Sequence, residues 1–125
     1  MINGRYFPGS GSNLQPILAA TGLKLGSHAQ STSVEEPGTF DLIGKPNPFS
    51  VELIKEEHGI SLKSRTLMVG DNPTTDILFG KNGGIDQCLV LSGIVRSLDE
   101  FMQNWLPKNE QYRPTWVMQM VGDLQ

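Results

Sequence analysis

The sequence predicts an α/β protein with a parallel, doubly wound sheet, and three observations lead to this prediction. Short apolar runs recur from Thr39 onward, most of them followed by a stretch with helical apolar spacing. Turns rich in glycine, proline and asparagine separate these segments. Two carboxylates, Asp71 and Asp76, come soon after one apolar run. Alternating strands and helices are typical of a parallel sheet, whose ligands bind beyond the carboxyl ends of its strands.

Length and composition indicate one compact unit of modest size. The chain has 125 residues, 38% of them hydrophobic, which suits a single domain with its own core. The net charge is −3 and the lysines and arginines are scattered, so we expect no nucleic-acid partner. No apolar run is long enough to span a bilayer, and residues 1–5 lack a signal-peptide hydrophobic region. We therefore expect no membrane association and a cytoplasmic location.

The first third of the chain predicts one helix, one loop and one strand. Ser12 or Asn13 can cap a helix over residues 14–20, which ends at Gly22. Residues 26–38 are rich in serine, threonine, glutamate and proline without an apolar period, so they form a solvated loop. Residues 39–43 then form a short strand.

The middle of the chain predicts a helix, a strand and a second helix. Asn47 caps a helix that starts at Pro48 and ends near His58. Its apolar side chains should face inward: Phe49, Leu53 and Ile54. A strand over residues 66–69 follows, and Thr74 or Thr75 caps a helix that runs to residue 82.

The last third repeats the alternation. A strand over residues 87–91 leads to a helix over 98–105 that Ser97 caps. A polar loop over 107–114 precedes a final strand over 115–118 and a terminal turn over 121–124. This alternation of strands and helices is what a parallel, doubly wound sheet looks like in sequence.

Asp71 and Asp76 are the first candidates for a functional site. Asp71 is the first residue after a strand that ends at Gly70, so its carboxylate should lie where ligands of such sheets bind. Carboxylate oxygens are hard ligands for a divalent cation. The same residues also fit a simple polar turn, in which Asp76 favours the positive end of the next helix. The carboxylates alone leave both possibilities open.

Lys45 favours the functional alternative. Gly44 precedes it and Pro46 follows it, so the lysine lies on a constrained loop outside any helical repeat. A lysine ammonium can hold a phosphate as a point charge, and a metal bound by Asp71 could neutralise the same group from another side.

These segments together resemble a known family. Gly-Lys-Pro-Asn-Pro at 44–48, a helix, Arg-Thr-Leu-Met-Val-Gly-Asp at 65–71 and Thr-Asp-Ile-Leu-Phe-Gly at 75–80 resemble haloacid dehalogenase-like (HAD) phosphatases. The most similar branch contains 4-nitrophenylphosphatases, phosphoglycolate phosphatases and pyridoxal phosphate phosphatases, which carry a large α/β cap. The resemblance covers residues from about 4 to 124.

The resemblance implies a fold and a division of the chain. It implies a three-layer, Rossmann-like parallel sheet, of which residues 44–125 are the latter half of the core. Residues 1–43 would be the end of the cap and the return linker, with an insertion at 24–38. Tyr-Phe-Pro-Gly-Ser-Gly-Ser at 6–12 and the following helix look like the last piece of that cap.

The resemblance also implies a Mg²⁺-dependent phosphatase that hydrolyses small-molecule phosphomonoesters through an aspartyl-phosphate intermediate. Asp71 would bind Mg²⁺, and Lys45 would be the catalytic lysine that holds the nucleophile and the phosphoryl oxygens. Asp76 would not bind the metal directly; it would orient metal-bound water or Lys45. Asn72 would help to bind the phosphate.

One family motif does not occur in these 125 residues. Family members begin with a strand ending in Asp-x-Asp-Gly, whose first aspartate is the nucleophile, and the sequence contains no Asp-x-Asp. The chain therefore resembles the carboxyl-terminal part of such an enzyme. Two alternatives follow: a phosphatase whose amino-terminal part is missing here, or a catalytically inactive phosphate-binding or protein-interaction module.

The partners follow from the same reasoning. In the resembled fold, the strand over 66–69 lies beside the nucleophile strand, so its free edge would be apolar and open to pairing. We expect self-association, such as a dimer, or pairing with a missing amino-terminal half. The cap chooses the substrate in this family, so the particular phosphomonoester is left open.

Overall fold

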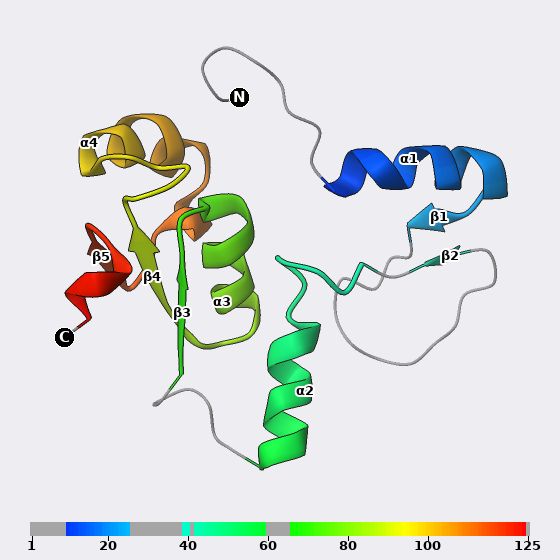
Figure 1. The fold of residues 1–125 in the computed structure, drawn as a ribbon, viewed down its shortest axis with the longest axis horizontal. Coiled ribbons are helices and arrows are strands. Elements are labelled where there is room, and N and C mark those ends of the chain that lie inside the picture. Colours follow the sequence, from blue (N-terminus) through cyan, green and yellow to red (C-terminus); the bar gives the residue numbers. More distant parts are fainter. Residues whose placement is uncertain (1–9, 26–38, 41, 60–65, 125) are drawn as a thin grey trace. The chain divides into compact units, whose positions relative to one another are not determined.

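The computed structural model describes residues 10–25, 39–40, 42–59 and 66–124. The chain divides into two compact units, Met1–Leu42 and Ile43–Gln125. Figure 1 shows the elements of each unit along the chain. The boundary falls one residue before the predicted end of the cap segment at residue 43; the identification of that segment as part of a cap stays a prediction.

The first unit contains one helix and a small parallel sheet. Helix α1 spans Ser10–Thr21, and strand β1 (Lys24–Leu25) pairs in parallel with β2 (Thr39–Phe40). The helix begins at Ser10, before the predicted residue 14. The prediction missed its first turn because that turn is polar and has no apolar period. It ends as predicted, since Gly22 adopts a left-handed φ of 67° after the last turn.

Some predictions for this unit meet the structure only in part. Residues 24 and 25, the first two of the predicted insertion at 24–38, form strand β1. The predicted loop over 26–38 lies outside the described residues, as does most of the cap-like segment at 6–12. Of the strand predicted over 39–43, the structure describes residues 39 and 40 as β2, and residues 42 and 43 are not assigned to a strand.

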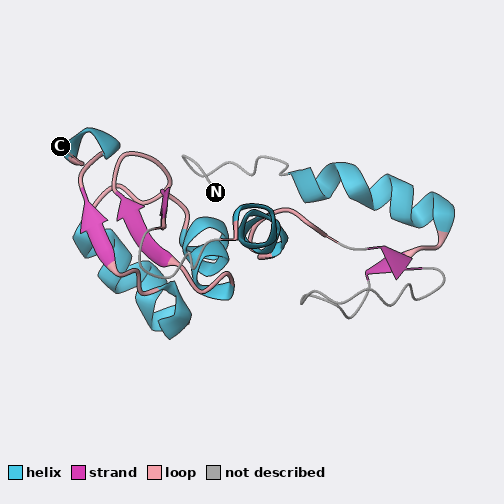
Figure 2. Ribbon diagram, turned by 90° about the horizontal axis from the view of Figure 1, so that it is seen from below, coloured by secondary structure: helices cyan, strands magenta, loops and turns pink. Residues whose placement is uncertain are grey.

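The second unit is built on a three-stranded parallel sheet. Its strands are β3 (Leu67–Gly70), β4 (Asp86–Val90) and β5 (Trp116–Met118), in the order β3-β4-β5. Val69 pairs with Cys88, which in turn pairs with Trp116. Figure 2 shows the strands side by side with helices along the sheet. This arrangement confirms the predicted α/β class and parallel sheet.

The helices of this unit lie close to their predicted positions. Helix α2 spans Phe49–His58, and the Asn47 side chain accepts a hydrogen bond from the Phe49 amide at 2.9 Å. A π-helical turn, Pro73–Ile77, leads into α3 (Leu78–Asn82). Helix α4 (Leu98–Glu100) continues as a π-helical turn over Phe101–Trp105. Ser97 caps α4 as predicted, through the Glu100 amide at 3.1 Å.

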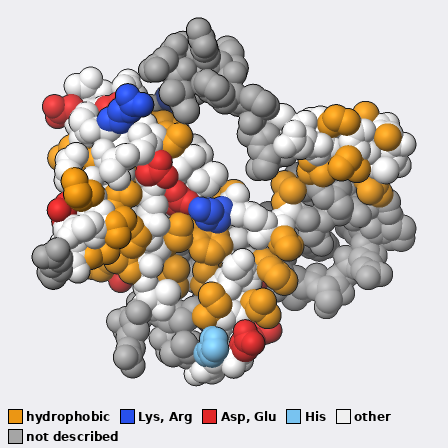
Figure 3. All heavy atoms as spheres, in the orientation of Figure 1, with side chains coloured by type: hydrophobic (Ala, Val, Ile, Leu, Met, Phe, Trp, Pro, Cys, Tyr) orange, Lys and Arg blue, Asp and Glu red, His pale blue; other side chains and the backbone are white. Residues whose placement is uncertain are grey.

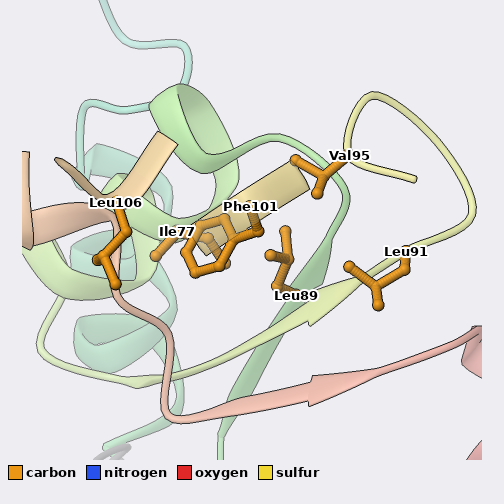
Figure 4. Packing of buried hydrophobic residues seen from close by; sticks show 6 residues of the cluster. All are labelled: Ile77, Leu89, Leu91, Val95, Phe101 and Leu106. Carbon is orange, nitrogen blue, oxygen red and sulfur yellow. The ribbon is translucent and has the colours of Figure 1, made fainter. Parts of the chain in front are cut away.

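The main core lies between β4 and the helical segments that follow β3 and β4. Figure 4 shows its side chains pointing toward one another from these elements. Its members are all buried: Ile77, Leu89, Leu91, Val95, Phe101 and Leu106. A smaller cluster joins α2 to the sheet through Val51 and Ile85, with Met68 and Phe79 packed against it. The core therefore fixes the carboxyl end of β3 to its neighbours, because Ile77 follows that end by a few residues.

The predicted inward face of α2 is wrong. Phe49, Leu53 and Ile54 are each more than 40% exposed, and Figure 3 shows hydrophobic side chains at the surface where α2 lies. The buried side chain is Val51, and Lys55, one turn later, donates to the Gly83 carbonyl at 2.7 Å. Val51 and Lys55, one turn apart on the helix, therefore face Gly83, the residue after α3. Apolar spacing alone did not indicate this orientation.

A helix that crosses a membrane must be both long and apolar. Within the described ranges, no helix has both the length and the apolar composition that crossing a bilayer requires.

Candidate active site

Asp71 lies directly beyond the carboxyl end of β3, as the sequence predicted. Its Oδ2 accepts a hydrogen bond from the Ile94 amide at 2.8 Å. Ile94 belongs to the loop after β4, the neighbouring parallel strand. Carboxyl ends of adjacent parallel strands meet at one edge of a sheet, and this contact joins two of them. The Asp71 carboxylate is therefore held at the edge where ligands of such folds bind.

Asp76 is a buried carboxylate with two donors. The residue is only 4% exposed. Its Oδ1 accepts from the Lys45 ammonium at 2.6 Å, and its Oδ2 accepts from the Asn72 amide at 3.0 Å. A buried carboxylate needs such partners, because losing water without replacing its hydrogen bonds is costly. The structure thus brings Lys45 and Asp76 together, 31 positions apart in the chain.

Lys45 reaches this carboxylate from a loop of the same unit. The loop is a tight turn, in which the Asn47 amide donates to the Gly44 carbonyl at 3.0 Å, and the Lys45–Pro46 peptide bond is cis. The lysine side chain is 49% exposed while that of Asp76 is 6% exposed. Among the described residues, Asp76 thus holds the Lys45 ammonium while about half of the lysine side chain stays exposed.

Asn72 has a structural role that the sequence interpretation gave to other residues. Its side-chain oxygen accepts from the Thr74 amide at 3.0 Å and from the Thr74 hydroxyl at 2.8 Å. Asn72, and not Thr74 or Thr75, is thus the cap of the π-helical turn. Asparagine suits this position because its short side chain accepts from a backbone amide two residues later. The side-chain nitrogen of Asn72, Nδ2, takes part in none of these bonds and is the atom that could make the predicted phosphate contact.

Two glycines make room for the carboxylates. A Cβ at Gly70 would overlap the Asp76 carboxylate, and a Cβ at Gly93 would overlap the Asp71 carboxylate. The sequence interpretation noted Gly70 only as the end of the strand before Asp71, and it missed Gly93 and Ile94 altogether. A signal was available, because Gly93 follows the next predicted strand and parallel strands end at the same edge.

The donor set fits a cation only in part. Among the described residues, no three histidines, cysteines, aspartates or glutamates gather around one point. Mg²⁺ is usually held by one or two carboxylates together with water and phosphate oxygens, so a single carboxylate is an adequate contribution. Asp71 fits that role, because the Ile94 amide engages one of its oxygens. Asp76 is already occupied by the Lys45 ammonium and the Asn72 amide.

Cys88 is not part of this site. It lies on β4 and is 1% exposed, and burial raises the pKa of its thiol above the ordinary value. A raised pKa leaves less of the nucleophilic thiolate at neutral pH. Cys88 is therefore a buried structural thiol.

Comparison with known proteins agrees with the fold and the motifs. Residues 42–124, nearly the whole second unit, match the family model described as HAD-hydrolase-like. Chronophin of Homo sapiens is 37% identical over 83 residues, which are 66% of this chain and 27% of that protein. Chloroplastic phosphoglycolate phosphatase 1A of Arabidopsis thaliana is 49% identical over 53 residues, 42% of this chain and 14% of that protein.

A solved structure extends the similarity to nearly the whole chain. The 4-nitrophenylphosphatase of Thermotoga maritima superposes with a TM-score of 0.64 at 34% sequence identity. The match covers 94% of this chain and 36% of that one. The chain thus spans well under half the length of each of these relatives. It belongs to the HAD-like hydrolases, in the branch of the 4-nitrophenylphosphatases and phosphoglycolate phosphatases.

Proposed function

We propose that this chain supplies the lysine and the metal-binding carboxylate of a Mg²⁺-dependent phosphatase for small phosphomonoesters. The observation that carries the proposal is the Lys45–Asp76 pair at 2.6 Å, whose carboxylate also accepts from the amide of Asn72, the residue that follows Asp71 beyond the carboxyl end of β3. A half-exposed lysine side chain and a carboxylate at the ligand-binding edge of a parallel sheet suit a phosphate with its cation. Family membership supports the same chemistry.

Lys45 acts on the charge of the transferring phosphoryl group. Asp76 holds its ammonium in place on one side, so the ammonium meets the phosphoryl oxygens already oriented. Preorganised positive charge stabilises a transition state because it needs no rearrangement during the reaction. Asp71, oriented by the Ile94 amide, presents its carboxylate to the cation. When bound, Mg²⁺ would supply charge neutralisation on the phosphate oxygens.

The nucleophile comes from outside these 125 residues in this proposal. An aspartate carboxylate would attack phosphorus, forming an Oδ–P bond as the bond from phosphorus to the leaving alkoxide breaks and a second acid protonates that alkoxide. Water would then attack the aspartyl phosphate, releasing inorganic phosphate and restoring the carboxylate. Lys45 stabilises the negative charge in both steps, because the same oxygens carry it.

A chimera tests the proposal without requiring the natural partner segment. Residues 1–125 would replace the matching third of the Thermotoga maritima 4-nitrophenylphosphatase, which superposes on 94% of this chain. We expect turnover of 4-nitrophenyl phosphate that needs Mg²⁺ and that EDTA abolishes. Asp71→Asn should abolish it, and Asp99→Asn, a matched change on α4, should leave it intact. An active chimera that is insensitive to Asp71→Asn would contradict the proposal.

Substrate, partners and location stay predictions. Chronophin and the phosphoglycolate phosphatases suggest a small phosphomonoester, and a substrate panel on the chimera would rank candidates. Self-association and a cytoplasmic location rest on the sequence alone. A substrate ranking identical to that of the intact Thermotoga maritima enzyme would mean that the retained cap of the host, and not this chain, selects the substrate.

A further inference from the structure

The Lys45 loop is fixed to α3 at a second point besides the Asp76 carboxylate. The Asn82 side-chain amide donates to the Pro46 carbonyl at 2.9 Å, 36 positions away in the chain. Pro46 directly follows Lys45, so this bond holds the backbone next to the lysine. The Asp76 bond holds only the end of the lysine side chain.

Both contacts come from one helical segment. Asp76 belongs to the π-helical turn over Pro73–Ile77, and Asn82 is the last residue of α3, which continues that turn. The segment therefore contacts the loop at two points, the Lys45 ammonium and the backbone carbonyl of Pro46. A lysine side chain has considerable rotamer freedom to lose when it is ordered. When the backbone next to Lys45 is already fixed, less conformational entropy is lost as its ammonium pairs with Asp76.

Helix α2, which follows the Lys45 loop, contacts Gly83, the residue after α3. Lys55 of α2 donates to the Gly83 carbonyl at 2.7 Å. Gly83 lies so close to Val51 that a Cβ there would come within 2.9 Å of a Val51 methyl group. These contacts fix α2, whereas Asn82 is the described side chain that hydrogen-bonds to the backbone of residues 44–48 from α3. Removing its amide would take away this contact of the Lys45 loop while leaving the contacts of α2 in place.

We propose that Asn82 is a positioning residue for Lys45. It touches no reacting group; it holds the Pro46 carbonyl so that the Lys45 ammonium stays on Asp76 and faces outward. The catalytic consequence rests on the proposed function, but the positioning itself rests on the two hydrogen bonds alone. A merely structural Asn82 would add stability without affecting how strongly Lys45 and Asp76 interact.

A double-mutant cycle separates these two roles. Lys45→Met, Asp76→Asn and the double variant would be unfolded in urea, in the full native chain and again with Asn82→Ala. Both tryptophans, Trp105 and Trp116, lie in the Ile43–Gln125 unit, so their fluorescence follows that unit. The cycle yields the coupling between Lys45 and Asp76 in each background. Asn104→Ala, an exposed asparagine on the turn after α4, is the matched control background.

We expect the coupling to fall to less than half in the Asn82→Ala background and to stay unchanged in the Asn104→Ala background. Equal coupling with and without Asn82, or no measurable coupling in the native chain, would overturn the proposal. If Asn82→Ala does not fold, Asn82→Ser takes its place, since its side chain is shorter than the amide. The cycle requires no turnover, so failure of the phosphatase proposal would leave this result interpretable.

Discussion

Asp76 is the residue on which the local structure of the site depends. Its carboxylate is buried, so it must be paired, and its two oxygens take the Lys45 ammonium and the Asn72 amide. Removing one partner of a buried charge is more harmful than replacing both, because the remaining charge is left without its partner. The Lys45 contact therefore differs from an exposed ion pair such as Arg113 with Glu110, whose side chains are both largely in solvent.

Gly70→Ala tests how tightly the Asp76 carboxylate is packed. A Cβ at this position would overlap that carboxylate, so we expect the free energy of unfolding to fall by about 1–3 kcal/mol. The urea midpoint followed by tryptophan fluorescence would measure the change. The control is Gly122→Ala, where the nearest heavy atom, the Met120 Sδ, is 3.8 Å from the added Cβ. Equal midpoints for the two variants would contradict the close packing.

Gly93→Ala tests the place of the Asp71 carboxylate. The added Cβ would overlap that carboxylate and push it from the Ile94 amide. We expect the native chain to bind Mg²⁺ weakly, and we expect both Gly93→Ala and Asp71→Ala to lose the heat of Mg²⁺ binding in calorimetric titration. Gly122→Ala should keep it. Indistinguishable heats for the native chain and Asp71→Ala would remove Asp71 as the metal ligand.

Sequence reasoning predicted the candidate residues better than their contacts. It placed Asp71 beyond a strand end and chose Lys45 from its position between glycine and proline, and the structure brings Lys45 to Asp76. It did not foresee the Asn72 cap, because several residues of that turn can accept from the same amides. It also missed Gly93 and Ile94, since their contact depends on which two strands are neighbours.

At the scale of elements, β4 is the centre of the second unit. It pairs with β3 on one side and β5 on the other, and four of its five residues are buried. Strands buried on both faces read as continuous apolar runs, which explains why the sequence indicated this strand so clearly. The site lies at its carboxyl end because Ile94 follows it within a few residues.

Leu89→Ala tests the contribution of this strand. Leu89 is fully buried in the main core, so its truncation should lower the free energy of unfolding by about 2–5 kcal/mol. Val117→Ala on β5 is a matched control, because Val117 is 38% exposed and its truncation should cost under about 1 kcal/mol. Urea unfolding of both variants would give the difference. A smaller loss for Leu89 than for Val117 would contradict the assignment of the core.

The element that sequence reasoning misjudged is α2. Its apolar residues, Phe49, Leu53 and Ile54, have helical spacing, which usually marks the buried face. In the structure Val51 is buried instead, and the 49/53/54 strip is exposed among the described residues. Periodicity shows that a helix has an apolar side, but it does not show which neighbour in the fold will cover it.

At the scale of the whole molecule, the site belongs to one unit. Lys45, Asp71 and Asp76 all lie in the Ile43–Gln125 unit, which nearly coincides with the part that matches the HAD-hydrolase-like family. Strand β3 carries the site and, within the described part of the chain, pairs only with β4. An edge of this kind offers unpaired backbone groups to another strand.

Leu67→Lys tests association through this edge. Leu67 on β3 is 36% exposed, and a lysine on an edge strand opposes pairing with another strand. We expect the native chain to associate as its concentration rises, and we expect Leu67→Lys to reduce the associated fraction in analytical ultracentrifugation. Leu98→Lys, at an exposed leucine of α4, should leave it unchanged. A sharp native monomer at high concentration, with β3 amides strongly protected in hydrogen exchange, would contradict this prediction.

The most direct test of the account is the kcat of the chimera with Lys45→Met. Losing a preorganised donor to transition-state charge typically lowers kcat by about 10²–10³-fold, and we predict a loss of that order. Lys108→Met removes an equally long cation, which lies 5.4 Å from the Trp105 ring centroid, and should keep kcat near that of the parent chimera. Equal kcat values for Lys45→Met and Lys108→Met would show that the Lys45–Asp76 pair has no part in phosphate chemistry.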